Sequence, residues 1–178
     1  MVNFKSDRLD FSPLTPDMVG QSYPDSLNNP EINQFLETRH KEQNIESCKN
    51  YIEECNLDDS CQLFGVFLRS NGSHIGNVKI GYINWLYKTG QISLVIFDQS
   101  LSGQGFGFEI VHSATKYAFN ELMLEKVEAG AYLANKASIR VFEKVGYKKE
   151  GQIRESIILY GDRADYALLG IIKDELVE

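Results

Sequence analysis

The sequence has few cysteines, few histidines and no surplus of positive charge. Its 178 residues include three Cys and three His, and the formal net charge is −7. Cys48, Cys55 and Cys61 lack C-x-x-C spacing, so we expect free thiols rather than a disulfide framework or a zinc site, and we predict no metal. The acidic balance argues against a nucleic-acid partner, because no excess of Lys and Arg is available to neutralise phosphates.

Long apolar runs are also absent. Residues 1–8 contain no apolar signal region, and no later run is long enough to span a membrane. We therefore expect a cytoplasmic protein with no membrane partner. Without an export signal, Asn71-Gly72-Ser73 is better interpreted as a hairpin turn than as a glycosylation site. The length and composition fit one domain over residues 1–178.

Strand patterns and helix patterns alternate along the chain. Strands are predicted over residues 8–14, 62–69, 74–85, 92–98, 126–132, 147–159 and 163–172. Helices are predicted after Thr15-Pro16, after Asn29-Pro30, from Asn44 or Ser47 to Cys55, over 105–121, and from Asn135 to Gly146. The strand–helix–strand order of residues 92–132 implies a parallel pair with a right-handed crossover. The predicted class is α/β: a mixed, mostly antiparallel twisted sheet of about seven strands flanked by about four helices.

The most informative stretch follows the strand at residues 92–98. Ser102-Gly103-Gln104-Gly105-Phe106-Gly107 has glycines at alternate positions, which leave no side chain to block a ligand. Apolar residues then recur at helical spacing, so a helix begins near Gly105 or Phe106. A helix start with free amides and a positive dipole end suits a phosphate. On this pattern alone, a second interpretation stays open, in which the glycines only permit tight packing.

Two blocks of the second half resemble the GCN5-related N-acetyltransferase (GNAT) family, particularly its branch of ribosomal-protein N-terminal acetyltransferases. The first is Ser102–Gly107, where the family has Gln/Arg-x-x-Gly-x-Gly/Ala. The second and longer block is Leu124–Ala129, then Asn135–Tyr147, then Glu150-Gly151. The resemblance covers about residues 74–173. It implies the GNAT fold with a splayed central parallel strand pair, and acetyl-coenzyme A (acetyl-CoA) as the donor.

The resemblance also implies how the donor is held. The pyrophosphate is expected on the backbone amides of Gly103, Gln104, Gly105, Phe106, Gly107 and Phe108. The pantetheine arm is expected to pair with Leu94, Val95 and Ile96. Asn135 matches the family's pantetheine-contacting Asn, although an Asn at a helix start is also a good cap. Ser102 departs from the family's Gln or Arg, which removes one side-chain contact to phosphate.

The implied reaction is the attack of a neutral amine on a thioester. A backbone N–H near Val95 is the expected donor to the developing oxyanion. Many relatives have a Tyr seven residues after the Asn to protonate the leaving thiolate, but this chain has Phe142 there. Ser138 matches the Ser of the ribosomal-protein branch, so we expect it to bind the CoA sulfur; a local bond at the helix start is the alternative. No general base is fixed, and the candidates are Glu37, His74, Asp98, Tyr160 and Tyr166.

Two stretches favour a small amine as the acceptor. Residues 27–39 and 75–84 resemble segments that border the acceptor cleft in relatives acetylating amino sugars. The candidate substrate-binding residues are Glu37, Asn77 and Tyr160, and the predicted acceptor is an amino sugar, free or nucleotide-linked. The Ser138 pattern fits a ribosomal-protein-like N-terminal acetyltransferase equally well. A non-catalytic CoA-binding module and a plain interaction domain are alternatives from other classes, and a monomer or a homodimer is expected.

Overall fold

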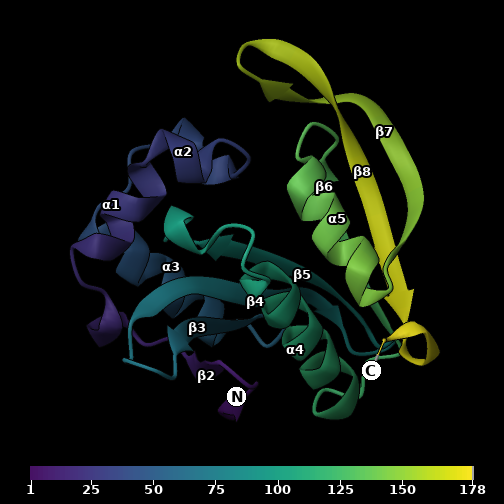
Figure 1. Ribbon diagram of the computed structural model, residues 1–178, viewed down its shortest axis with the longest axis horizontal. Coiled ribbons are helices and arrows are strands. Elements are labelled where there is room, and N and C mark those ends of the chain that lie inside the picture. The colour runs from purple at the N-terminus through teal and green to yellow at the C-terminus, as the bar shows by residue number, and fades with distance from the viewer. Residues whose placement is uncertain (178) are drawn as a thin grey trace.

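The computed structural model describes residues 1–177 and shows an open mixed sheet with helices on both faces (Figure 1). The strands are β1 (Phe4–Lys5), β2 (Leu9–Pro13), β3 (Gln62–Leu68), β4 (His74–Asn84), β5 (Thr89–Ile96), β6 (Lys126–Tyr132), β7 (Lys148–Leu159) and β8 (Asp162–Ile172). Their order in the sheet is β1-β2-β3-β4-β5-β6-β8-β7, and among the strands of residues 1–177 only the β5–β6 pair is parallel. The predicted α/β fold with one parallel pair is confirmed. The additional strand is β1, whose two residues are too few to produce a recognisable alternation.

Within residues 1–177, five α-helices cover the sheet, against the predicted total of about four, and each lies in one of the five stretches predicted to be helical. They are α1 (Ser22–Asn28), α2 (Pro30–Asn33), α3 (Ile45–Leu57), α4 (Phe106–Asn120) and α5 (Lys136–Val145). Four short 3-10 turns accompany them: η1 (Pro16–Met18), η2 (Glu37–His40), η3 (Gln99–Leu101) and η4 (Lys173–Glu175). The segment predicted to be helical from Thr15 to Leu27 is divided into η1 and α1. Val19 is extended there and is followed by Gly20, a poor helix former.

Local chemistry sets several of the helix starts. The Asn29 side chain accepts a hydrogen bond from the Glu31 N–H at the start of α2. At α3, the Asn44 side chain accepts from the Ser47 N–H while the Ser47 hydroxyl accepts from the Asn44 N–H. This reciprocal pair is a capping box, and it confirms the predicted cap at Asn44.

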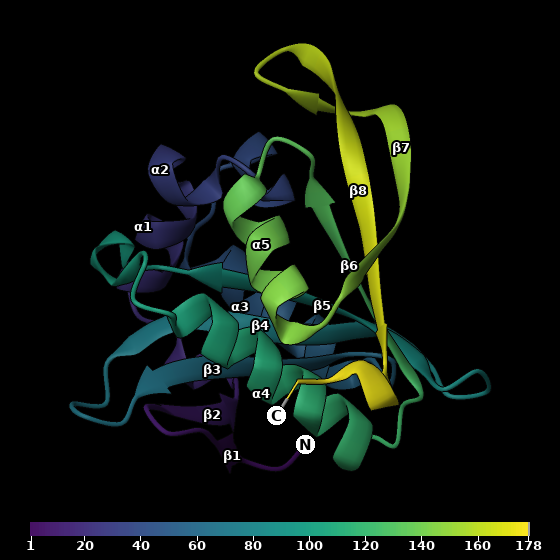
Figure 2. The same ribbon diagram turned by 45° about the vertical axis from the view of Figure 1, so that its right-hand side comes forward.

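Two apolar clusters lie on the two faces of the sheet. One includes Ile110 of α4 and Phe142 of α5, and the other includes Tyr23 of α1 and Ile52 of α3. Side chains along β5 alternate between them: Leu94 and Ile96 pack against the first cluster, and Val95 and Phe97 against the second. Figure 2 shows α4 and α5 together on one side of the sheet.

The parallel pair separates after three residue pairs. Strand β5 pairs with β6 only at Thr89, Gly90 and Gln91, but it continues to Ile96 beside β4. Strand β6 likewise continues to Tyr132 beside β8. Beyond Gln91 the facing edges of β5 and β6 are therefore unpaired, which confirms the predicted splay. In both ribbon views β6, β7 and β8 turn away from β5 (Figures 1 and 2).

Among the described residues, no helix is both long enough and apolar enough to cross a membrane. Cys48, Cys55 and Cys61 are buried free thiols, as predicted.

Candidate active site

The glycine turn that follows β5 contains two left-handed residues. Gly103 has φ +75° and Gly105 has φ +84°, and Gly105 directly precedes the first residue of α4, Phe106. A Cβ at Gly103 would meet no atom within 4 Å, and one at Gly105 would meet only Arg8 Nη2 at 3.6 Å. Backbone conformation, rather than crowding, therefore requires glycine at both positions. The predicted helix start is confirmed.

The N-terminus of α4 presents free backbone donors. The first four N–H groups of a helix have no partner within the helix. Within residues 1–177, no carbonyl or side chain accepts from the N–H groups of Gly105, Phe106, Gly107 or Phe108, and the first helical bond is Glu109 N–H to Gly105 O at 3.1 Å. Together with the dipole of a 15-residue helix, these donors fit an anionic group such as a phosphate.

Gly107 has a different role from the other two glycines. A Cβ there would lie 3.3 Å from Val141 Cγ2 on α5, so this glycine permits α4 and α5 to pack closely. Both interpretations of the glycine pattern therefore apply, at different positions. Gly103 and Gly105 shape the turn, and Gly107 serves the packing.

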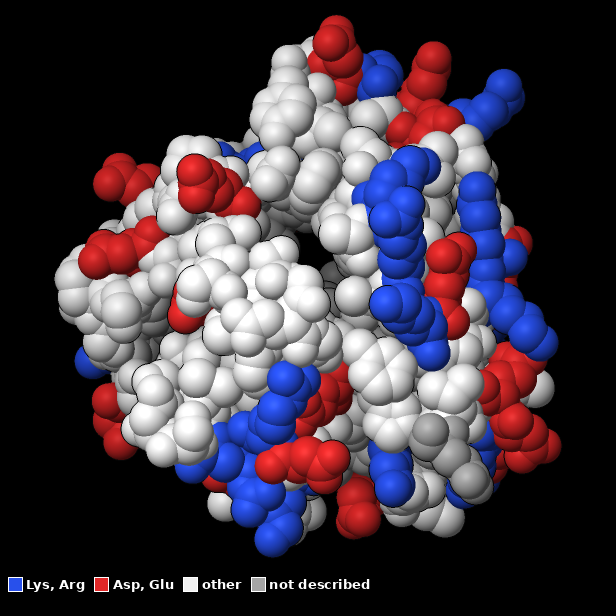
Figure 3. All heavy atoms as spheres, in the orientation of Figure 1, with Lys and Arg blue, Asp and Glu red and all other residues white. Residues whose placement is uncertain are grey.

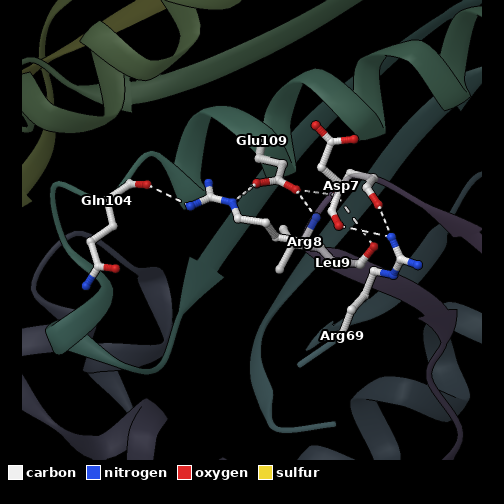
Figure 4. Close-up of polar contacts among 7 residues, drawn as sticks. Asp7, Arg8, Leu9, Arg69, Gln104 and Glu109 are labelled. Carbon is white, nitrogen blue, oxygen red and sulfur yellow. Dashed lines mark hydrogen bonds and ion pairs between the residues drawn. The ribbon is translucent and has the colours of Figure 1, made fainter. Parts of the chain in front are cut away.

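Arg8, which directly precedes β2, contacts the glycine turn through its side chain (Figure 4). This residue is not among those predicted from the sequence. Its Nε donates to Glu109 Oε2 at 2.6 Å, and its Nη1 donates to the Gln104 carbonyl at 3.1 Å. The guanidinium carbon lies 3.9 Å from the centre of the Phe106 ring. One side chain thus contacts both the turn and the first turn of α4.

Glu109 is the acidic partner in this contact. Burial favours a higher pKa for its carboxyl, but hydrogen bonds from the Ser6 hydroxyl, the Arg8 N–H and the Arg8 side chain outweigh it. The pKa of Glu109 therefore lies below its ordinary value. The carboxylate remains ionised at neutral pH and keeps its bonds to Arg8.

The backbone alternation of β5 determines which groups face the gap. The Lys88 carbonyl accepts from Glu125 at the β6 side, whereas the Phe97 N–H donates to the Ile75 carbonyl at the β4 side. Polar groups of successive residues point to opposite edges of a strand. The N–H groups of Leu94 and Ile96 therefore face the gap. The Val95 N–H, which the sequence predicts as the donor to the oxyanion, points toward β4 instead.

The start of α5 lies on the other side of the gap. The Asn135 side chain accepts from the Ser138 N–H at 3.1 Å, so its role as a cap is present in the structure. The Asn135 amide nitrogen and the Ser138 hydroxyl form no hydrogen bond with another described residue. Phe142 is buried and packs edge-on against Tyr147 at 5.0 Å, as a core residue.

A space-filling view shows the molecule hollowed beside α5 (Figure 3). A column of basic side chains covers the outer face of this helix, where Lys136, Arg140 and Lys144 recur at helical spacing and are all exposed. The hollow therefore has basic side chains along its α5 side.

A polar cluster ties residues 34–40 to the far end of β6 and to the β7–β8 hairpin. The Tyr132 hydroxyl donates to the Glu37 carboxylate, and Arg39 Nη2 donates to the Tyr132 hydroxyl at 2.6 Å and to the Ile158 carbonyl at 2.7 Å. The Tyr160 hydroxyl donates to Gln34 Oε1 at 3.2 Å. Burial and the bond to Glu37 raise the pKa of Tyr132, so this hydroxyl stays protonated. Glu37 and Tyr160 are among the residues predicted from the sequence, whereas Tyr132 and Arg39 are not.

The remaining candidates have partners of their own. Asn77 is 5% exposed and lies 2.8 Å from His74 Nε2. Burial lowers the pKa of His74, whose ring packs among aromatic side chains. Asp98 caps η3 by accepting from the Ser100 N–H and hydroxyl. Tyr166 lies beside Tyr132, with ring centres 6.0 Å apart, and so borders the cluster around Glu37.

The splayed parallel pair, the turn after β5 and the open N-terminus of α4 are the features that the resemblance to GNAT acetyltransferases implies. The chain belongs to the acetyltransferase (GNAT) domain family, whose sequence profile matches residues 8–148. This confirms the predicted family and the predicted class, an N-acetyltransferase. The branch within the family stays a prediction.

Similar proteins agree with this assignment. The chain is 34% identical to "Probable N-acetyltransferase YjcK" of Bacillus subtilis over 113 residues, which are 63% of this chain and 62% of that protein. It is 28% identical to the uncharacterized N-acetyltransferase YokL, from the SPbeta prophage of B. subtilis, over 85% of this chain and 83% of YokL.

Solved structures share the fold at lower identity. The spermidine N-acetyltransferase of Vibrio cholerae, in complex with CoA and spermine, superposes with a TM-score of 0.82 at 20% identity, over 96% of this chain and 98% of that one. A GNAT acetyltransferase from Bacillus anthracis gives 0.83 at 19% identity, over 98% of this chain and all of that one (100%).

Proposed function

We propose that the protein transfers an acetyl group from acetyl-CoA to a small primary amine. One observation carries the proposal: the free N–H groups at the start of α4 lie at the end of the strand whose edge is unpaired. In a GNAT domain, this arrangement provides backbone N–H donors for the phosphates of CoA and an unpaired strand edge for its extended pantetheine arm.

The donor site is built mainly from backbone. In the proposal, the free amides of residues 103 and 105–108 bind the pyrophosphate, and the gap-facing groups of Leu94 and Ile96 pair with the pantetheine arm. The Gln104 N–H, also predicted to bind phosphate, instead donates to the Leu101 carbonyl at 3.3 Å. Acetyl-CoA supplies an activated thioester when bound. The Ile96 or Leu94 N–H takes the place of Val95 as donor to the acetyl oxygen. In the same proposal, the side-chain amide nitrogen of Asn135 contacts the pantetheine arm, and the Ser138 hydroxyl contacts the CoA sulfur.

The acceptor site is assigned to the cluster around Glu37. The Glu37 side chain is 75% exposed yet held in place by Tyr132, so it offers an oriented carboxylate to a cationic amine. Such a carboxylate would orient the ammonium group and accept its proton. The structural relative that holds spermine supports testing a polyamine first, with an amino sugar as the second probe.

The test is acetyl transfer by the purified protein with spermidine, glucosamine and an N-terminal peptide, followed through release of the CoA thiol. We expect turnover with a small amine. Glu37→Gln should raise KM for the amine about tenfold, as expected for the loss of a charged hydrogen bond, without changing KM for acetyl-CoA. Glu31→Gln is the matched control, because this exposed carboxylate has no bond to another described side chain.

Two results would contradict the proposal. Tight CoA binding with no acetylated product from any amine would favour a non-catalytic CoA-binding module. Absence of CoA binding by a folded protein would favour a plain interaction domain. An unchanged KM in Glu37→Gln would remove only the acceptor assignment.

A further inference from the structure

Arg8 does more than attach the N-terminal strand to α4. We propose that Arg8 is a positioning residue for donor binding, which orients the Gln104–Gly105 peptide so that its N–H faces the phosphates. This inference rests on the proposed function, because it assigns a partner to the same phosphate turn.

Peptide geometry links the Gln104 carbonyl to the Gly105 N–H. Arg8 Nη1 donates to the Gln104 carbonyl at 3.1 Å. That carbonyl and the Gly105 N–H belong to one planar trans peptide, so they point in opposite directions. By holding the carbonyl, Arg8 directs the Gly105 N–H to the opposite side of the turn. This N–H is one of the free donors of the proposed phosphate site.

The turn needs such a restraint. Gln104 lies between Gly103 and Gly105, and glycine has the greatest backbone freedom of any residue. A turn that must be ordered during binding loses affinity, whereas a preorganised turn keeps it. The Arg8 guanidinium is itself fixed on its other sides, by Glu109 and by the Phe106 ring. The guanidinium therefore holds the glycine turn in a fixed position relative to the first turn of α4.

The structural attachment of this segment does not depend on the guanidinium. Glu109 also accepts from the Ser6 hydroxyl at 2.6 Å and from the Arg8 backbone N–H at 2.8 Å. These bonds remain when the Arg8 side chain is shortened. The Arg8 side chain is 45% exposed and the Glu109 side chain 13%, but Glu109 keeps two hydrogen-bond donors when the guanidinium is removed, so its carboxylate is not left unpaired. Removing the guanidinium should therefore affect the turn more than the fold.

Arg69 provides the matched control (Figure 4). It holds the same segment from the other side, because its Nη1 donates to the carbonyls of Ser6 and Asp7 at 3.1 and 2.9 Å. Its side chain is 43% exposed, which is nearly the value of Arg8. It has no contact with the glycine turn among the described residues.

The experiment compares Arg8→Gln, Arg8→Lys and Arg69→Gln with two donors: acetyl-CoA and S-acetylpantetheine, which lacks the pyrophosphate. Arg8→Gln should raise KM for acetyl-CoA and the Kd of CoA about tenfold, with kcat within about twofold. Its kinetics with S-acetylpantetheine should not change. Arg8→Lys should not restore affinity, since an ammonium lacks the fixed fork of the guanidinium. Arg69→Gln should match the wild type with both donors.

Several results would overturn the inference. Wild-type CoA affinity in Arg8→Gln would remove the positioning role. An equal loss with both donors would indicate a general structural role, and full recovery by Arg8→Lys would indicate attraction by charge alone. If the wild-type protein itself binds no CoA, the proposed function fails first, so the two failures are distinguishable.

Discussion

Replacing Gly105 by Val tests the phosphate turn most directly. Gly105 has φ +84° and ψ 1°, a left-handed conformation that costs a residue with a Cβ about 1–2 kcal/mol. Steric crowding adds little, because the nearest atom to the new Cβ is Arg8 Nη2 at 3.6 Å. Two structural outcomes are therefore expected for the variant. It can keep the turn and lose about 1–2 kcal/mol of unfolding free energy, or it can relax the turn and misdirect its N–H groups.

Gly72→Val separates strain from function. Gly72 has φ +73° in the β3–β4 hairpin, and a Cβ there would meet no atom within 4 Å. Both variants should lose similar stability in urea unfolding. Only Gly105→Val should lose CoA affinity in calorimetry, by about tenfold or more, which corresponds to about 1.4 kcal/mol. Gly105→Asn should retain most of the affinity, because Asn tolerates the left-handed region. Wild-type CoA affinity in a folded Gly105→Val protein would refute the assignment.

Two further predictions concern stability. Tyr147→Phe removes a buried bond of 2.9 Å between the Tyr147 hydroxyl and Thr115 Oγ1, so the unfolding free energy should fall by about 1 kcal/mol and Tm by about 2–4 °C. The control is the exposed Tyr87→Phe; equal Tm values for the two variants in calorimetry would contradict the prediction. Because the pKa of Glu109 is lowered in the folded state, its stabilising effect is present above the unfolded value of about 4.3 and is lost as pH falls through the lower folded value. Wild-type stability should therefore fall more steeply below about pH 4.3 than that of Glu109→Gln, and parallel urea titrations would contradict this.

Features with a local cause could be predicted from the sequence. The start of α4 after Gly105, the cap at Asn44 and the end of α5 at Gly146 all follow from the preferences of one or two residues. The parallel pair also follows from the order of elements along the chain. Strand β1 could not be predicted, because a two-residue strand has no periodicity.

Side-chain contacts between distant residues had no comparable signal. Arg8 meets Gln104 and Glu109 at sequence separations of 96 and 101 residues. Neither Glu109 in the first turn of α4 nor an Arg at the start of a strand indicates a partner. The direction of the Val95 N–H also required the structure, because it depends on which residues of β5 pair with β4.

The two halves of the proposed site therefore differ in how the sequence encodes them. The donor side consists mainly of backbone groups, so a short glycine pattern is enough to indicate it. The acceptor side is assembled from side chains of separate elements: Glu37 meets Tyr132 across 95 residues, and Arg39 reaches the Ile158 carbonyl across 119. A substitution in residues 34–40 or in the β7–β8 hairpin can change this cluster without altering the glycine turn. The donor half and the acceptor half of the proposed site can therefore change independently of each other.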